Sequence, residues 1–428
     1  MSTVMPERPR FISVLTEIPS VEPLPIRLIF IFFRPIWNIL GVLWLSRVEA
    51  PDLMRTTFIG FTLALAASGP LFASDPGTTS ADFLKLGVGP RAIAMGDAQV
   101  GLANDVYATY YNPAGLATLK TQEAAFTHTD YVQNISQEYL AYAYPHPRWG
   151  TIAASVTYLG YGTVQGYDAY AQPTGSVGAN DMDLGLSYSR DFYHDERYGT
   201  QLSAGVTGKW IQERLDTVKA TTYAGDLGLL FAPGIKWGEY LNGWKAGVAL
   251  RNVGAPMTFD QESFPLPRTL STGFSYTGNW RDESITLAVD GRQPNDGSRN
   301  LGVGLEIWTL QAFVLRAGYT TEGDLGSGLR IGAGVRFRTI QVDYAFASEG
   351  PLGNTQRFGL TLRFAAPKPD PVFLAQHSFE RGMRDYKKGR YNESMAEFTK
   401  AMELDPKHPQ AVEMMKQTYE KLREKSQE

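Results

Sequence analysis

Histidine is the side chain best suited to transfer protons near neutral pH or to ligate a metal, and this chain of 428 residues has five of them. They are His128, His146, His194, His377 and His408. No two of them stand at metal-ligand spacing. The chain has no Cys, which excludes disulfides, Cys-ligated zinc and thiol catalysis. We therefore expect loop or surface positions for these histidines, and no metal site.

Two other patterns are open to a chemical interpretation. Asp181 and Asp183 flank Met182 and could approach a cation, but two carboxylates without further oxygen ligands make a poor calcium site. Gly302-Val303-Gly304 and Gly332-Ala333-Gly334 resemble phosphate loops only superficially, because no helix follows either of them. They fit strand positions where a crowded neighbour leaves no room for a side chain. The sequence thus predicts no enzyme and no cofactor.

The composition indicates what kind of scaffold carries these residues. Gly occurs 43 times, Tyr and Phe 22 times each and Trp 8 times, while charged residues make up only 20%. Many short strands with tight turns and aromatic girdles at a membrane interface produce such a bias. The mean hydropathy of −0.22 argues against a polytopic helical membrane protein but not against a barrel, whose strands alternate between lipid and lumen. A net charge of −4 gives no nucleic-acid footprint.

Period-two alternation of apolar and polar residues runs through residues 121–364, as in Leu329 to Arg338. It predicts strands near 122–131, 136–144, 149–159, 182–190, 201–212, 222–232, 244–252, 269–278, 283–290, 300–308, 312–319, 329–337, 339–347 and 356–364. That is about fourteen strands, an even number, as bacterial outer-membrane barrels have. The fold class expected is an all-β transmembrane barrel of antiparallel strands.

The strand phase opposite the apolar one carries charged residues, which we expect to face a lumen. They are Glu306, Arg316, Arg330, Arg336, Asp343 and Arg363. A soluble β-sandwich or propeller is the alternative, in which these charges would face bulk water.

The N-terminal 73 residues contain two hydrophobic stretches. The second has the three regions of a secretory signal peptide: Arg55, the apolar run Phe58 to Ala67, and small residues before a cleavage point after Ala73. Because a signal peptide belongs at an N-terminus, residues 1–53 are interpreted as an extension of the gene model and 54–73 as the signal peptide. The stretch Arg27 to Leu45 holds Arg34-Pro35 and makes a poor transmembrane helix, although an inner-membrane anchor is the alternative.

Residues 74–120 are rich in Gly and Ala and end in the turn Asn112-Pro113-Ala114-Gly115. The run Phe83 to Ala92, then Met95 to Ala98, then Tyr110 to Leu116, resembles the opening of the PorV/PorQ family of FadL-like outer-membrane barrels. The resemblance implies that residues 74–120 fold back as a hatch inside the barrel 121–364. If that hatch forms a hydrophobic pocket, its residues are expected to be Phe83, Leu84, Leu86 and Ile93.

A Pro-rich linker, residues 365–371, separates the barrel from a helical tail, 372–428. Helices are predicted from Phe373 to Lys388, Tyr391 to Leu404 and about Pro409 to Lys425. One tetratricopeptide-like repeat is indicated by Gly382, Gly389, Tyr391, Phe398, Ala401 and Pro406. The chain departs from that repeat at Ser394 and Arg381, and a generic helical hairpin is the alternative.

The resemblance implies a docking component of type IX-like protein secretion or cargo attachment in the outer membrane. Its partners would be outer-membrane lipid and secreted cargo or secretion-machinery proteins, which would bind loops such as Gly162 to Ala179 and Pro256 to Pro267. The tail would lie in the periplasm with its own protein partner. One alternative is a FadL-like channel for uptake of a hydrophobic small molecule. A second is a barrel that anchors a periplasmic scaffold.

Overall fold

The computed structural model describes residues 77–195, 199–234, 243–280, 283–322, 326–364 and 371–425. The predicted extension 1–53, the signal peptide 54–73 and most of the linker 365–371 lie outside these residues. None of the helices in the described ranges is long and apolar enough to cross a membrane.

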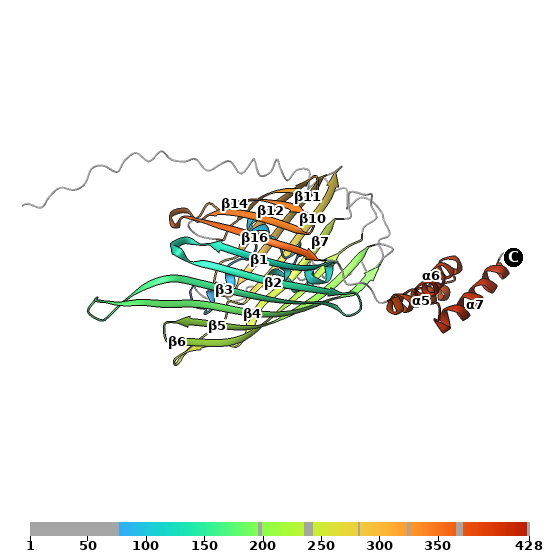
Figure 1. The fold of residues 1–428 in the computed structure, drawn as a ribbon, viewed down its shortest axis with the longest axis horizontal. Helices are drawn as coiled ribbons and strands as arrows, with labels where there is room; N and C mark the ends of the chain where they lie inside the picture. The colour runs from blue at the N-terminus through green and yellow to red at the C-terminus, as the bar shows by residue number, and fades with distance from the viewer. Residues whose placement is uncertain are drawn as a thin grey trace, which may run out of the picture. The chain divides into compact units, whose positions relative to one another are not determined.

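Fourteen strands form one closed antiparallel barrel in which neighbours in sequence are neighbours in the sheet, as Figure 1 shows. The strands are β1 (Gln122–Asp130), β2 (Ser136–His146), β3 (Gly150–Tyr167), β4 (Pro173–Asp195), β5 (Thr200–Leu215), β6 (Val218–Ala232), β7 (Trp244–Gly254), β10 (Thr269–Trp280), β11 (Glu283–Pro294), β12 (Asn300–Thr309), β13 (Phe313–Thr320), β14 (Leu329–Phe337), β15 (Ile340–Ser348) and β16 (Asn354–Phe364). The predicted fold class and strand number are confirmed.

The barrel closes where β1 pairs with β16, with Gln122 opposite Phe364. The first strand therefore starts, and the last strand ends, at the same end of the barrel, which we name the proximal end. The opposite, distal end carries a small sheet of β8 (Met257–Phe259) and β9 (Glu262–Phe264), and two 3-10 turns, η3 (Val132–Asn134) and η5 (Gly350–Leu352).

Burial alternates along most of the length of the strands, because successive side chains point to opposite faces of a sheet. In β13 the side chains of Phe313, Leu315 and Tyr319 are exposed on the outer wall, whereas Arg316 and Thr320 are buried inside. An apolar outer face and a polar, charged interior are what a bilayer requires of a barrel.

Val335 on β14 tests this assignment, since its side chain lies on the outer wall and is 48% exposed. Val335→Arg is expected to destabilise the barrel in a bilayer by about 2–4 kcal/mol near the midplane, and less closer to an interface. Val335→Leu should be nearly neutral, and urea unfolding in lipid vesicles measures both. Gly334 is no inward control, because a Cβ there would lie 2.1 Å from Asp343 Oδ1. Equal effects of Arg and Leu at position 335 would contradict the outward assignment.

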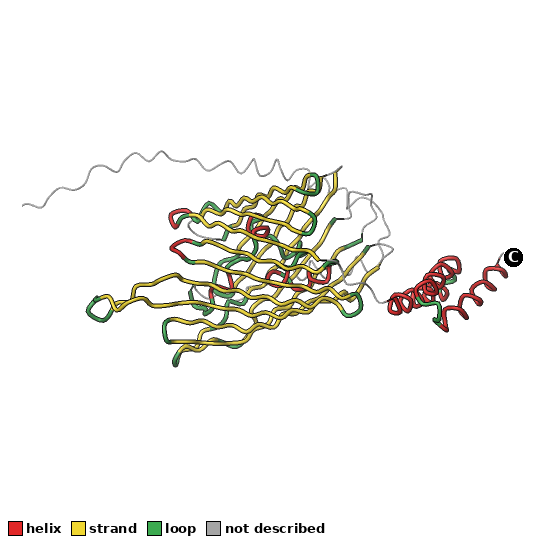
Figure 2. The backbone as a smooth tube through the Cα atoms, in the orientation of Figure 1, coloured by secondary structure: helices red, strands yellow, loops and turns green. Residues whose placement is uncertain are grey.

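The hatch comprises residues 77–120 and contains η1 (Asp82–Lys85), α3 (Pro90–Ala94), α4 (Ala108–Tyr111) and η2 (Pro113–Thr118). Figures 1 and 2 show these short elements enclosed by the strands. The hatch starts at the distal end, where Ser80 N donates to Pro265 O (3.0 Å), and it leads into β1 at the proximal end. Its side chains are almost all buried, so the hatch is the core of this protein.

The structure corrects one prediction at the distal end. Most of the predicted loop Gly162 to Ala179 is strand, because β3 and β4 continue past their neighbours and stay paired from Thr163 with Gly178 to Tyr167 with Pro173. Figure 2 shows this long hairpin; we name residues 161–178 the arm. Glycines and turn-forming residues hide its strands, since they interrupt the period-two pattern.

The tail folds into three helices: α5 (Pro371–Lys387), α6 (Tyr391–Leu404) and α7 (Pro409–Lys425). These agree with the predicted helices to within two residues at each end. Phe379, Phe398, Ala401 and Ala411 form their core. Its tetratricopeptide character stays a prediction.

Two of the predicted repeat positions, Gly382 and Phe398, lie in close contact. A Cβ at Gly382 would lie 2.6 Å from the Phe398 ring, so only glycine lets α5 and α6 approach this closely. Ser394, which departs from the repeat, is buried and donates from Oγ to Gly382 O (2.9 Å). The hydroxyl is therefore satisfied at a position where the repeat usually has Ala.

Candidate functional site

The inner wall of the barrel meets the hatch backbone at glycines. A Cβ at Gly318 would lie 2.2 Å from Gly96 N, and one at Gly302 would lie 2.2 Å from Gly96 O. On the other side of the lumen, a Cβ at Gly205 would lie 2.3 Å from Pro113 C. No side chain fits at such distances, which explains the Gly-x-Gly pattern of the strands. The hatch is consequently seated directly on the wall.

The turn Asn112 to Gly115 holds one end of the hatch. Asn112 Oδ1 accepts a hydrogen bond from Ala114 N (3.2 Å), which starts η2. Its Nδ2 donates both to Val100 O in the hatch (2.9 Å) and to Leu229 O in β6 (3.1 Å). A Cβ at Gly115 would lie 2.1 Å from Ala103 O. The Asn and the Gly of the motif thus have separate physical roles. Asn112 links the hatch to the barrel wall by hydrogen bonds, and Gly115 allows the backbone at Ala103 to approach closely.

Buried ion pairs join the hatch to the other half of the wall. Arg91 donates to both oxygens of Glu306, at 2.8 and 2.7 Å, and to Asp105 Oδ2 at 2.9 Å. Arg316 donates to Glu306 Oε2 (2.7 Å) and to Asp343 Oδ1 (2.6 Å). Glu306 therefore receives two guanidinium groups, one from the hatch and one from β13.

The other three predicted lumen charges are spread over the wall. Arg330 pairs with Asp97 of the hatch, and Arg363 donates to Glu123 Oε1 (2.9 Å). Arg336 stacks on Trp308 with its guanidinium carbon 4.1 Å from the ring centre. Sequence reasoning missed Arg91, Asp97 and Asp105, although charges in a segment so rich in Gly and Ala are a usable signal.

Asp97 is buried in the hatch beside two arginines. Besides Arg330, Arg292 approaches it at 3.6 Å, and Tyr111 donates a hydrogen bond to it at 2.9 Å. Burial alone would raise the pKa of the Asp97 carboxyl, but the positive charges of Arg330 and Arg292 outweigh burial and hold this pKa below its ordinary value. Asp97 is consequently an anion that ties the hatch to β14 and β11.

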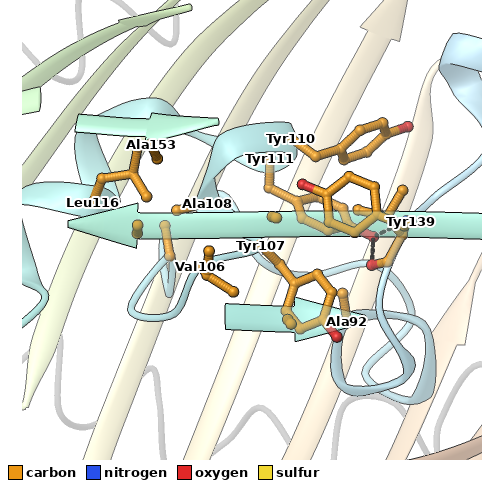
Figure 3. Close-up of a cluster of buried hydrophobic side chains, with 14 of the residues drawn as sticks. Ala92, Val106, Tyr107, Ala108, Tyr110, Tyr111, Leu116, Tyr139 and Ala153 are labelled. Atoms are coloured by element: carbon orange, nitrogen blue, oxygen red, sulfur yellow. Dashed lines mark hydrogen bonds between the residues drawn. The ribbon is translucent and has the colours of Figure 1, made fainter. Parts of the chain in front are cut away.

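Aromatic side chains also pack the hatch against the barrel wall. Figure 3 shows Tyr107, Tyr110 and Tyr111 of the hatch gathered near Tyr139 of β2. Tyr107 and Tyr139 stack with ring centres 5.7 Å apart, and Thr109 Oγ1 lies 2.5 Å from Tyr139 Oη. The hatch is therefore held in the barrel by three kinds of contact: close backbone packing against wall glycines, buried ion pairs and aromatic packing.

The four residues proposed for a hydrophobic pocket do not meet in one place. Phe83 and Leu84 are buried in a packed cluster with residues such as Met257, and Leu86 packs against that cluster. Ile93 belongs to another cluster, with Ala94, Ala345 and Ala347. Ile93 points elsewhere because it sits on α3, which contacts β13 to β16.

Two cavities border the hatch, and charged side chains are among the residues that line each of them. The larger, of about 610 Å³, lies towards the proximal end and is lined by residues that include Arg91, Glu306, Trp308, Arg336 and Arg363. The smaller, of about 30 Å³, lies towards the distal end beside Tyr110 and Arg292, and has room for only one or two waters. In the described ranges, no three His, Asp or Glu side chains are arranged to hold a metal.

A closed antiparallel barrel with an apolar outer wall, a charged lumen and a tightly seated N-terminal hatch defines a plugged outer-membrane β-barrel. The family model of type IX secretion system protein PorV matches residues 74–290, which is half of the chain. The chain belongs to this family, whose members are named as secretion components. The match covers the hatch and the strands up to β11, and it confirms the resemblance found in the sequence.

Solved structures with similar folds are more distant. The toluene transporter TbuX of Ralstonia pickettii is 14% identical, with a TM-score of 0.44, over 65% of this chain and 98% of its own. The toluene transporter TodX of Pseudomonas putida is 11% identical, with a TM-score of 0.43, over 68% and 98%. A FadL homologue of Pseudomonas aeruginosa is 10% identical, with a TM-score of 0.38, over 65% and 98%. No curated protein matches significantly.

Proposed function

We propose that this chain is a docking component of type IX secretion, an outer-membrane barrel that holds secreted proteins or machinery proteins rather than conducting a solute. The observation that carries the proposal is the seating of the hatch, whose backbone abuts wall glycines and whose Arg91 is paired with Glu306 across the lumen. A passage would have to break both kinds of contact. Binding of a protein to surfaces outside the lumen requires no movement of the hatch.

The arm is the proposed docking surface. Residues 161–178 contain no Lys or Arg, and their only carboxylate is Asp168 at the tip. Natural proteins protect a free strand edge with Lys or Pro, and here Pro173 stands only beside the tip. Tyr167 and Tyr170 are 65% and 85% exposed, and tyrosine is enriched among the residues that anchor protein interfaces. An unprotected edge with exposed tyrosines fits a protein partner.

The lengths of the turns at the two ends of the barrel support a proposal for its orientation in the membrane. We place the proximal end, with its short turns at 310–312 and 338–339, in the periplasm, and the distal end, with the arm and residues 255–268, at the cell surface. The tail after Phe364 then lies in the periplasm, where a tetratricopeptide-like hairpin would hold a protein partner. In the same scheme, residues 54–73 direct export, the mature chain begins near Ser74, and residues 1–53 are absent from it.

The test removes the arm and leaves the barrel. Replacing residues 163–177 by Asn-Gly joins β3 and β4 above the point where β2 and β5 end, so the barrel should still form and remain heat-modifiable. Display of a type IX cargo at the cell surface should fall by about tenfold or more, because two interface anchors are lost.

The matched control inserts Asn-Gly in the proximal turn at Arg148 and should leave display unchanged. Normal display by the arm deletion would contradict the docking role. Normal display together with lost growth on a hydrophobic carbon source would support the uptake channel instead.

A further inference from the structure

The outer wall of β5 and β6 carries an ordered series of cross-strand pairs. From the proximal to the distal end, the outward pairs are Leu202 with Phe231, Ala204 with Leu229, Val206 with Leu227, Gly208 with Gly225, Trp210 with Tyr223, Gln212 with Thr221, and Arg214 with Lys219. Apolar pairs thus give way to an aromatic pair, then to a neutral polar pair, and finally to two cations.

The position of this last pair follows from membrane dimensions. Aromatic residues mark the boundary of the hydrocarbon core in outer-membrane barrels, and Trp210 and Tyr223 occupy that place here. Arg214 is four residues further along β5, which at about 3.3 Å per residue and a strand tilt of about 40° puts it roughly 10 Å above the boundary. That is the level of lipid head groups.

The two cations face each other without a protein anion between them. Arg214 and Lys219 are exposed and directly opposite in the register, an arrangement that destabilises a sheet. Arg214 Nε donates only to the backbone oxygen of Asp216 (3.0 Å), and its partner on β4 is Asn180. Within the described residues, neither side chain forms an ion pair. An external anion would remove this repulsion.

The distal rim is not basic all round. On β1 and β2 it carries Asp130 and Glu138, whose carboxylates approach His128 at 3.1 and 2.5 Å. The loops before β10 and β12 carry the exposed cations Arg268 and Arg299, but among the described strand pairs only Arg214 and Lys219 set two cations directly opposite each other. The arrangement therefore selects where along the wall an anionic head group would bind.

We propose that Arg214 and Lys219 form a binding site for the phosphate of an outer-leaflet lipid. The guanidinium of Arg214 and the ammonium of Lys219 donate charge-assisted hydrogen bonds to the phosphate. Trp210 and Tyr223, which lie nearer the membrane centre, contact the part of the acyl chains next to the head group. The site is independent of the docking role of the arm, although it uses the same assignment of the distal end to the cell surface.

Native mass spectrometry of the full mature chain tests the site, with bisphosphorylated lipid A as the probe and the same lipid without phosphates as its comparison. The unchanged chain should retain the phosphorylated lipid preferentially. Arg214→Gln with Lys219→Gln should weaken this retention by roughly 30-fold, since each basic residue near a membrane surface contributes about fivefold and the two factors multiply. Arg214→Lys with Lys219→Arg should keep it.

The matched control, Arg190→Gln with Arg338→Gln, removes two exposed cations from the proximal end and should leave retention unchanged. Heat-modifiability checks that each variant is folded. If the double variant does not fold, Lys219→Gln alone takes its place, since it removes no contact with another side chain. This single variant should show an intermediate loss of lipid retention. Equal retention of both lipids by the unchanged chain would overturn the proposal. So would equal losses in the distal and proximal variants.

Discussion

Glu306→Ala is expected to lower the free energy of unfolding by about 3 kcal/mol, the lower end of the range for breaking a buried ion pair on one side, because the partner charges lose part of their compensation. Here two guanidinium groups, Arg91 and Arg316, each lose one of their two carboxylates and keep only Asp105 and Asp343, respectively. Since Arg91 belongs to the hatch, the same change should loosen the plug and raise the ion conductance above that of the unchanged protein. Urea unfolding and planar-bilayer recordings measure the two effects separately.

Glu283→Ala is the matched control. Glu283 is also a carboxylate lining the larger cavity, but its side chain is exposed and joins no ion pair among the described residues. Its loss should change stability by less than about 0.5 kcal/mol and open no conductance. Similar, small effects of the two variants would show that the ionic seat of the hatch contributes little. The hatch would then be held by its backbone contacts alone.

The strands were predictable because lipid on one side and a filled lumen on the other impose a period of two over more than two hundred residues. The prediction missed strand residues mainly where that constraint ends: in the arm, in the small sheet of β8 and β9, and at strand ends such as that of β4. In the arm, both faces of the hairpin meet solvent, and side chains such as Gln165 and Tyr167 are exposed. Apolar and polar residues therefore do not have to alternate there. The strands there are paired through the backbone, with one added hydrogen bond from Gln165 Nε2 to Gly175 O (3.0 Å), and neither contact leaves a period-two pattern in the side chains.

The partners of the lumen charges could not be predicted, for a different reason. Glu306 and Arg316 pair across adjacent strands, and a register would have shown it. Arg91 and Asp97 reach their partners Glu306 and Arg330 from a segment without periodicity, more than two hundred positions earlier in the chain. Only the path of the hatch through the lumen determines those pairs. The family resemblance located the hatch in the lumen but did not give its path.

The tail was predictable to within two residues, because its helices keep a period near 3.6 and their ends carry specific signals. Gly389 follows α5 with φ of 72°, a left-handed conformation that favours glycine, and α7 begins at Pro409. What the tail binds is not encoded in such signals. That question depends on which side of the membrane it occupies, for which the strand number gives a prediction.

An even number of strands brings the chain back to the side from which it started, so the tail is expected in the periplasm, beyond reach of protease added to intact cells. Deleting residues 367–428 should leave a folded, heat-modifiable barrel, because the hatch and wall contacts all lie before Phe364. The deletion should abolish a periplasmic association, detected as loss of a specific cross-linked partner.

A tail that only stabilises the barrel would give the opposite result, with a lower unfolding midpoint and no partner lost. Protease should cut the tail only after the outer membrane is permeabilised. Digestion in intact cells would place the proximal end at the surface, and with it the arm in the periplasm. The docking role and the lipid-phosphate site would then both have to be reassigned to the other membrane face, so this single experiment tests the sidedness on which each depends.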